Sequence, residues 1–122
     1  MGLSSAGEVI GLNAILASRF LSLHTNDPGD SGLNEVATSG TGYVRQAVSF
    51  TNSGGNPTSA KNNALVQYAT ATATWGTITH FGIWTAASGG SFLGWGTITV
   101  PKLVSLDDVV RFLADALEIT MN

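Results

Sequence analysis

Hydrophobic and polar residues alternate with a period of two in several parts of the chain, which is the spacing of half-buried β-strands. The stretch from Trp75 to Val100 shows this most clearly, because the pentapeptide WGTIT occurs twice, at Trp75–Thr79 and at Trp95–Thr99. Between the two copies lie small residues with two adjacent glycines, Gly89 and Gly90, which accept the positive φ of a tight turn. The pattern predicts a β-hairpin around which the other elements pack.

The first segment follows a helical period instead. Apolar residues recur at helical spacing between Val9 and Leu16. Before them, the run Ser5-Ala6-Gly7-Glu8 matches a capping box, in which the first and last side chains satisfy backbone N–H groups. These features predict a helix over about residues 5–18.

Period-two alternation begins at Arg19 and predicts strands from there onward. Turn-forming residues such as Pro28 and Gly29 separate the strands. Pro101 is expected to limit the second strand of the hairpin, because proline lacks the N–H group that a strand ladder uses. Besides the hairpin, the predicted strands are Arg19–Thr25, Tyr43–Phe50 and Ala64–Ala69 with an extension over Thr70–Trp75, and the intervening loops cover residues 26–42 and 51–63.

The C-terminal segment fits two structures. Ser105-Leu106-Asp107-Asp108 is a plausible capping box for a helix over residues 106–116. The run Val109–Phe112 has strand propensity, however, and Leu117–Met121 alternates like a terminal strand. Taken with the short strands and the loops rich in Gly, Pro and Asn, the chain is expected to form one domain over residues 1–122. Its predicted fold class is mainly β, an antiparallel β-sandwich or small barrel with one short N-terminal helix.

Charge is the most informative feature of the composition. Only 11% of the 122 residues are charged, against about 25% in an average soluble domain, and the net charge is −3. This balance argues against nucleic-acid binding, which needs clustered Lys and Arg. The sequence contains no cysteine and no apolar run long enough to cross a membrane. A surface built mainly of Ser, Thr, Asn and Gly suits a subunit that its neighbours cover.

Residues with catalytic or metal-binding chemistry are sparse. His24 and His80 are the only histidines, and neither has a second histidine or a carboxylate at the spacing of a catalytic or metal site. Asp27, Asp30 and Glu35 do not match the calcium-loop pattern, so ordinary turn chemistry is the simpler interpretation. The sequence also lacks a nucleophile elbow and a phosphate-binding loop. We therefore expect no enzyme activity, no cofactor and no bound metal.

Tryptophans and arginines are the candidates for an interface. Trp75, Trp84 and Trp95 would form the platform of a carbohydrate-binding module, but a tryptophan in a small β-domain is more often in the core or at a subunit interface. Arg45 and Arg111 lie within apolar strands, where each either pairs with a carboxylate across an interface or points to solvent. The candidate interface residues are Phe81, Trp84, Trp95, Arg45 and Arg111.

Three segments together carry a resemblance to a known family. They are LSLHTNDPGDSGLNEV (Leu21–Val36), GYVRQAVSF (Gly42–Phe50) and ATWGTITHFGIWTAASGGSFLGWGTIT (Ala73–Thr99). Their order and their L-x-L-H-T-x-D-P-G, Y-x-R-Q and H-F-G-I-W motifs resemble small structural proteins of tailed bacteriophages, over about residues 20–100. In such proteins the C-terminal part forms two strands. The resemblance therefore favours strands at Val109–Leu113 and Leu117–Met121, although Asp107-Asp108 stands where the family has Gly-Asp.

The resemblance implies a non-enzymatic virion protein, made in the host cytoplasm and present in many copies. The first expectation is a capsid decoration (cement) protein, which stabilises the shell through contacts with the major capsid protein and with itself. A homotrimer is expected by analogy with cement proteins at three-fold positions. A tail or tail-fibre component in contact with other tail proteins is the alternative. A carbohydrate-binding β-module is the alternative from another class.

Overall fold

The structure, a computed structural model, describes residues 4–54 and 58–121. The chain is mainly β, with antiparallel sheets and a single short helix among the described residues, as the sequence predicts. In chain order the elements are α1 (Ser5–Leu16), β1 (Arg19–His24), β2 (Gln46–Val48), β3 (Phe50–Gly54), β4 (Thr58–Asn62), β5 (Val66–Gln67), β6 (Gly76–Trp84), β7 (Phe92–Val104), β8 (Arg111–Phe112) and β9 (Glu118–Met121).

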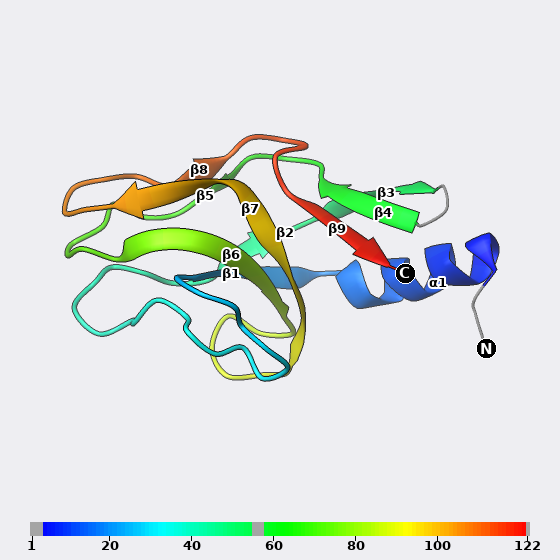
Figure 1. Cartoon of the computed structure of the whole chain (residues 1–122), viewed down its shortest axis with the longest axis horizontal. Coiled ribbons are helices and arrows are strands. Elements are labelled where there is room, and N and C mark those ends of the chain that lie inside the picture. Colours follow the sequence, from blue (N-terminus) through cyan, green and yellow to red (C-terminus); the bar gives the residue numbers. More distant parts are fainter. Residues whose placement is uncertain (1–3, 55–57, 122) are drawn as a thin grey trace.

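Three antiparallel sheets form a sandwich-like arrangement that does not close into a barrel (Figure 1). The largest sheet has the strand order β2-β1-β6-β7, the second has the order β3-β4-β9, and the third pairs β5 with β8. The largest sheet lies on one side of the molecule and the two smaller sheets lie on the other. The hydroxyl of Tyr68, which follows β5, donates to the carbonyl of Leu21 in β1 at 2.6 Å and so joins the two layers.

An aromatic cluster lies at the centre of the core. The ring of Tyr43 stacks on that of Tyr68 at 5.9 Å, and its edge meets Trp75 at 5.4 Å. The Trp75 indole N–H donates to the Thr41 carbonyl at 2.8 Å, so the polar atom of this buried ring has a partner. Further apolar side chains from both layers belong to the same core and include Leu21, Leu23, Ile78, Ile83, Val66, Val104, Phe112 and Leu117.

The predicted hairpin is confirmed as β6 and β7, but its second strand is longer than predicted. Residues 98–101 of β7 lie opposite Thr79 alone, because Ile78 pairs with Lys102 and His80 pairs with Thr97. Pro101 falls in this wide bulge, where no ladder hydrogen bond from its nitrogen is needed. The expectation that Pro101 limits the strand was therefore wrong, and β7 continues to Val104.

Two other strand predictions need correction. The predicted strand Tyr43–Phe50 is shorter, since only β2 and the first residue of β3 fall within it. The predicted loop 51–63 is instead the β3–β4 hairpin, paired from Phe50 with Asn62 onward, and its centre at residues 55–57 lies outside the described residues. The predicted strand over 64–75 is reduced to β5. The polar strands β3 and β4 gain their strand structure by pairing with each other and, for β4, with β9, which the local pattern does not reveal.

The two ends of the chain follow the prediction more closely. The N-cap of helix α1 is Ser4, one residue before the predicted Ser5. The Ser4 hydroxyl accepts from the Gly7 N–H at 3.1 Å. The side chains of Ser5 and Glu8 lie outside the described residues. The two C-terminal strands are confirmed as β8 and β9, although β8 covers only two residues of the predicted Val109–Leu113, and the helical alternative over residues 106–116 is wrong. Among the described residues, no helix is long and apolar enough to span a membrane.

Candidate functional site

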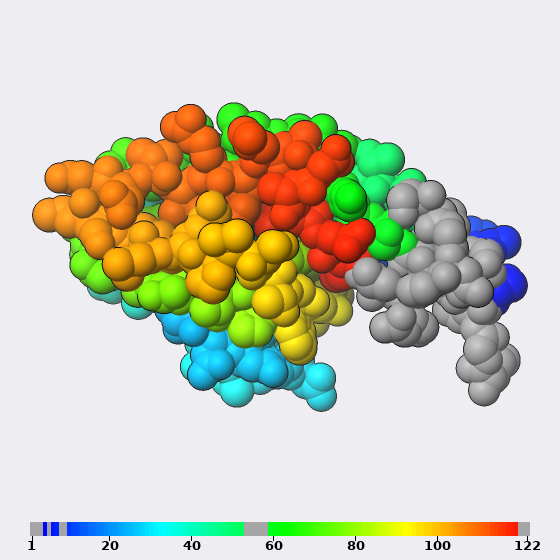
Figure 2. Space-filling model, turned by 45° about the horizontal axis from the view of Figure 1, so that its top comes forward, coloured from blue at the N-terminus to red at the C-terminus, as the bar shows by residue number. Residues whose placement is uncertain are grey.

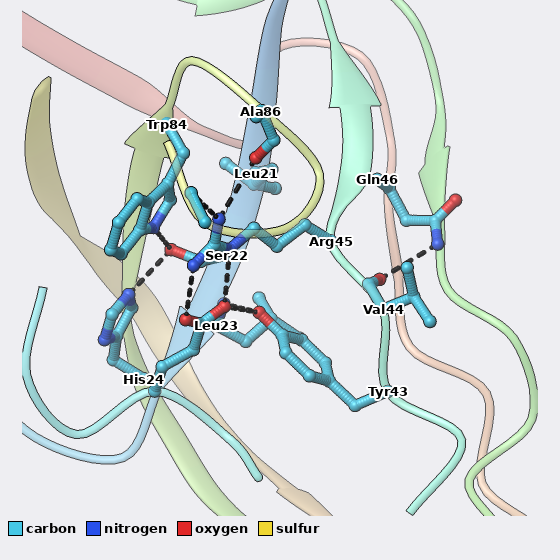
Figure 3. A network of polar contacts seen from close by, with 12 residues as sticks. Leu21, Ser22, Leu23, His24, Tyr43, Val44, Arg45, Gln46, Trp84 and Ala86 are labelled. Atoms are coloured by element: carbon cyan, nitrogen blue, oxygen red, sulfur yellow. Dashed lines mark hydrogen bonds and ion pairs between the residues drawn. The ribbon is translucent and has the colours of Figure 1, made fainter. Parts of the chain in front are cut away.

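A network of polar side chains lies on the outer face of the largest sheet, under the long loop that follows β1 (Figure 3). Its members come from β1, from the loop, from the segment before β2 and from the end of β6. They are Ser22, His24, Glu35, Tyr43, Arg45 and Trp84. The sequence did not predict that these six residues lie together in one network.

Arg45 is the centre of one half of the network. Its guanidinium binds the Glu35 carboxylate in a bidentate manner, with Nε 2.8 Å from Oε2 and Nη2 2.9 Å from Oε1. Its remaining nitrogen, Nη1, donates to the carbonyls of Ala86 and Gly89 at 3.0 and 2.8 Å. The guanidinium carbon lies 3.7 Å from the centre of the Trp84 ring, in cation–π geometry. Arg45 therefore ties the long loop, the hairpin turn and the sheet together.

Ser22 links Trp84 to His24 in the other half. The Trp84 indole N–H donates to Ser22 Oγ at 2.8 Å, and Ser22 Oγ lies 2.7 Å from His24 Nε2. His24 Nδ1 lies 2.7 Å from the Leu33 carbonyl. Because a carbonyl oxygen can only accept, Nδ1 carries the proton and Nε2 accepts from the Ser22 hydroxyl. Every hydrogen-bonding atom of these three side chains thus has a partner.

Burial and ion pairing set the charge states of the network. Burial lowers the pKa of His24 below its ordinary value of 6.5, so the ring is neutral. Burial alone would raise the pKa of Glu35, but hydrogen bonds from Arg45 and Tyr43 outweigh it and hold that pKa below its ordinary value. The hydrogen bond to Glu35 raises the pKa of Arg45, and burial raises the pKa of Tyr43. The network therefore holds one ion pair and a neutral histidine.

The Ser22–His24 pair has the atoms of a nucleophile and its base, but its surroundings differ from those of a catalytic pair. Both residues are fully buried, and the second ring nitrogen faces a main-chain carbonyl instead of a carboxylate. Gly82 on β6 packs against them so closely that an added Cβ would collide with Ser22 Oγ and lie 2.8 Å from His24 Nε2. The pair therefore acts as a packed support for the loop above it.

The structure separates the five candidate interface residues into different surroundings. Phe81 is fully buried and Trp84 is 9% exposed, so both belong to the interior of a single chain. Arg45 pairs with Glu35 of its own chain. Trp95 on β7 is 38% exposed, and Arg111 on β8 is exposed. The interface itself stays a prediction. Of the five candidate residues, Trp95 and Arg111 are the two whose side chains are exposed.

The alternative sites are less well supported by the geometry. A sugar platform needs tryptophans exposed in a row, whereas Trp75 and Trp84 are buried and Trp95 meets the ring of His80 edge-on at 5.4 Å. In the acidic loop, Asp27 Oδ1 accepts from the Gly29 N–H at 2.8 Å, which is the turn chemistry expected of it. Within residues 4–54 and 58–121, no group of three or more His, Asp or Glu side chains is arranged around a common metal position.

A second candidate site is an apolar surface at one end of the molecule, which we call the β7–β8 surface. It contains the exposed side chains of Val100, Leu103, Leu106, Val109 and Leu113. A groove of about 550 Å³ lies within it, with Ile98 and Phe112 in the lining and Lys102 and Arg111 beside them. The sequence pattern missed this surface because residues 105–116 fitted both helix and strand. An exposed apolar surface of this kind is a candidate site of contact with another molecule.

A buried, fully paired polar network and an exposed apolar groove on a weakly charged β-domain are features of a structural subunit. A family model described as Podophage GP4 fiber I protein gp80 matches residues 14–120. The chain belongs to this family and is a phage virion structural protein, which confirms the resemblance found in the sequence. A comparison with curated proteins finds no match.

Proposed function

We propose that this chain is a subunit of a phage tail fibre and that it works by binding neighbouring subunits, without catalysis. The family description names a fibre protein, which favours the tail-fibre alternative over the capsid decoration first expected. No finding supports a cement role in particular. We therefore propose a location in the tail instead of the capsid location first expected.

The observation that carries the proposal is the contrast between the two candidate sites. The polar network is closed, because its side chains bond to one another and to main-chain carbonyls. The β7–β8 surface is open and apolar, with Leu103 and Val100 each 68% exposed. Apolar area of this kind gains about 25 cal/mol for each Å² that a partner covers. A rigid interior with an uncovered apolar end suits a protein whose work is assembly.

The partners that fit this function are other fibre chains and further copies of this chain. Nucleic acid is a poor fit, because the chain carries only five basic residues and a net charge of −3. The homotrimer expected from the sequence stays a proposal.

The proposed function is tested by locating the chain on purified particles. Quantitative mass spectrometry of the particles should find far fewer copies than of the major capsid protein, and a gold-labelled antibody should mark the tail. Copy numbers similar to those of the capsid protein, with label over the shell, would return the chain to a decoration role. Absence from the particle would overturn the structural role in the mature virion.

A further inference from the structure

A second groove, separate from the β7–β8 surface, lies between the edges of two sheets. β7 and β9 are each the last strand of their sheet, and no main-chain hydrogen bond of the described residues joins them. The groove has a volume of about 330 Å³, and we call it the edge groove. In Figure 2 the first residues of β7, in yellow, lie between β9, in red, and the loop after β1, in blue. Its lining comes from residues 92–95 of β7, from Leu12 and Ile15 of α1, from Gly29 and Asp30 of the loop, and from Ile119 of β9.

Residues 92–95 of β7 leave one side of the strand open to another chain. In an antiparallel ladder every second residue turns its N–H and C=O groups away from its partner, and β7 has a strand partner, β6, on one side only. A Cβ added at Gly94 would meet only Ile119 among the described residues, at 3.7 Å. A glycine at such a position allows another backbone to approach closely. The edge groove therefore has room for an added strand.

The two sides of this strand edge differ in chemistry. Successive residues of a strand point to opposite faces, so Gly94 and Trp95 mark the two sides of the groove. Ile119 lies on the side of Gly94. Leu12 and Ile15 come from α1, which packs on the sheet that contains β9, so they belong to this side as well. One side of the edge groove is therefore apolar.

Asp30 is the charged group on the other side. Trp95 pairs with Gly82, which packs against the polar network under the loop that carries Asp30. Asp30 is exposed, and its carboxylate has no hydrogen-bond or ion-pair partner among the described residues. None of the chain's five basic residues lines the groove. An unpaired carboxylate beside an exposed indole ring fits a cationic side chain of a partner.

We propose that the edge groove binds an extended segment of another protein, in which an apolar residue is followed directly by Lys or Arg. The segment pairs with β7 as an added strand of the largest sheet, so its main chain supplies affinity and its alternate side chains supply selection. The apolar side chain enters on the side of Ile119. The next side chain points the other way, where its aliphatic stem packs on Trp95 and its charge reaches Asp30. This partner site is additional to the β7–β8 surface and shares no lining residue with the groove there.

The first test pans a displayed library of short random peptides on the purified full chain. The selected peptides should share an apolar residue followed directly by Lys or Arg. Asp30→Asn should remove the preference for the basic residue, and Asp30→Lys should replace it by Asp or Glu, because the charge at the groove is then reversed. Asp115→Asn is the matched control for Asp30→Asn and should select the wild-type consensus. Asp115 is exposed outside the groove, and asparagine tolerates its φ of 68°.

The second test closes the groove from the side of the strand. Gly94→Val places a side chain on the apolar side, so the affinity for a synthetic peptide of the wild-type consensus should fall by more than about tenfold in isothermal titration calorimetry. Thr97→Val is the matched control, because Thr97 is exposed on the same strand outside the groove, and it should bind as the wild type does. Urea unfolding of each variant separates loss of binding from loss of fold. Asp30→Lys, at an exposed side chain without a partner, supplies the same comparison if Gly94→Val does not fold.

Several outcomes would overturn the inference. They are the absence of a consensus, a consensus without a basic residue, and selection of the same peptides by Asp30→Lys and the wild type. Unchanged peptide affinity in a folded Gly94→Val would exclude an added strand at this edge. A different sedimentation mass of Asp30→Lys without peptide would assign the groove to a second copy of the chain instead. None of these outcomes bears on the particle location, so the two proposals can fail separately.

Discussion

Arg45 is the residue through which three separate parts of the chain are joined. Its charge is matched by Glu35 on the long loop, its plane lies over Trp84, and its free N–H groups reach the hairpin turn at Ala86 and Gly89. Such a bidentate, stacked guanidinium cannot be replaced by another side chain with the same set of contacts. Its loss would leave the Glu35 carboxylate without its counter-ion.

Replacement of Arg45 by glutamine should therefore lower the free energy of unfolding by about 2 kcal/mol, because a largely buried carboxylate loses its charged partner. Urea unfolding followed by tryptophan fluorescence would measure the change. Arg111→Gln is the matched control on an exposed strand residue. It should shift the free energy by less than about 0.5 kcal/mol when measured at dilutions that keep the chain monomeric. Equal effects in the two variants would contradict a structural role for the ion pair.

His24 gives the fold a pH dependence of defined sign. Its pKa is lowered by burial, so the unfolded chain takes up a proton near pH 6.5 while the folded chain does not. Stability is therefore complete above about pH 6.5 and falls as the pH drops below it. The lowered pKa of Glu35 adds a second loss, which begins only below about pH 4.5.

Unfolding midpoints in urea at about pH 7.5, 6.0 and 5.0 would measure the first of these losses. The wild-type midpoint should fall over this range, and His24→Gln, although less stable overall, should show a smaller fall. A fall that is the same in both proteins would assign the titration to another group.

For single residues, the sequence identified some members of the polar network but did not predict that they lie next to one another. Arg45 and Trp84 were singled out as interface residues, yet their partners are Glu35 and Ser22 of the same chain. Glu35 was interpreted as part of a turn, because its spacing from Asp27 suggested nothing more. Their approach depends on how the long loop folds back over β1, which a residue pattern does not encode.

Among the elements, β7 contains two glycines that allow its packing to be tested. Gly94 and Gly96 both lie next to β9, but their surroundings differ. A Cβ at Gly96 would lie 2.5 Å from Phe81 Cζ and 3.2 Å from the Glu118 carbonyl, whereas one at Gly94 would meet only Ile119 at 3.7 Å. Gly96 is therefore packed closely by Phe81 of its own sheet and by β9, and Gly94 is not.

The two glycines provide a matched pair of variants. Gly96→Ala should lower the free energy of unfolding by about 1–3 kcal/mol, because Phe81 and β9 must shift to admit the methyl group. Gly94→Ala should change it by less than about 0.5 kcal/mol. Urea unfolding of both variants would measure the difference. Similar stabilities would mean that the layers are less tightly packed at Gly96 than the structure shows.

The elements with strong apolar alternation were predicted well, and those with polar sequences were not. β1, β6 and β7 are rich in large apolar and β-branched residues, which mark a strand without knowledge of its neighbours. β3 and β4 consist mainly of Thr, Asn, Ser and Lys, and Asn62 is buried only because it bonds to the Leu117 N–H and the Leu113 carbonyl. The strand structure of such polar segments depends on the strands they pair with, which the sequence of the segment itself does not show.

For the whole molecule, the fold class and the virion family could be predicted because each depends on many residues at once. The mainly β architecture follows from repeated short alternation, and the family from three segments in a fixed order. The position on the particle could not be predicted in this way. Tail and capsid subunits share low charge and apolar contact surfaces, so composition does not separate them.

The first and last elements that the structure describes, α1 and β9, lie at the same end of the molecule. Helix α1 and the final strand β9 both pack against β4, and Figure 1 shows them far from the turn between β7 and β8. Any covalent extension, such as a fluorescent protein, an affinity tag or a stretch of a longer polypeptide, therefore leaves from that side whichever terminus carries it. A particle labelled in this way would report the orientation of the subunit, with the opposite end free to touch its neighbour.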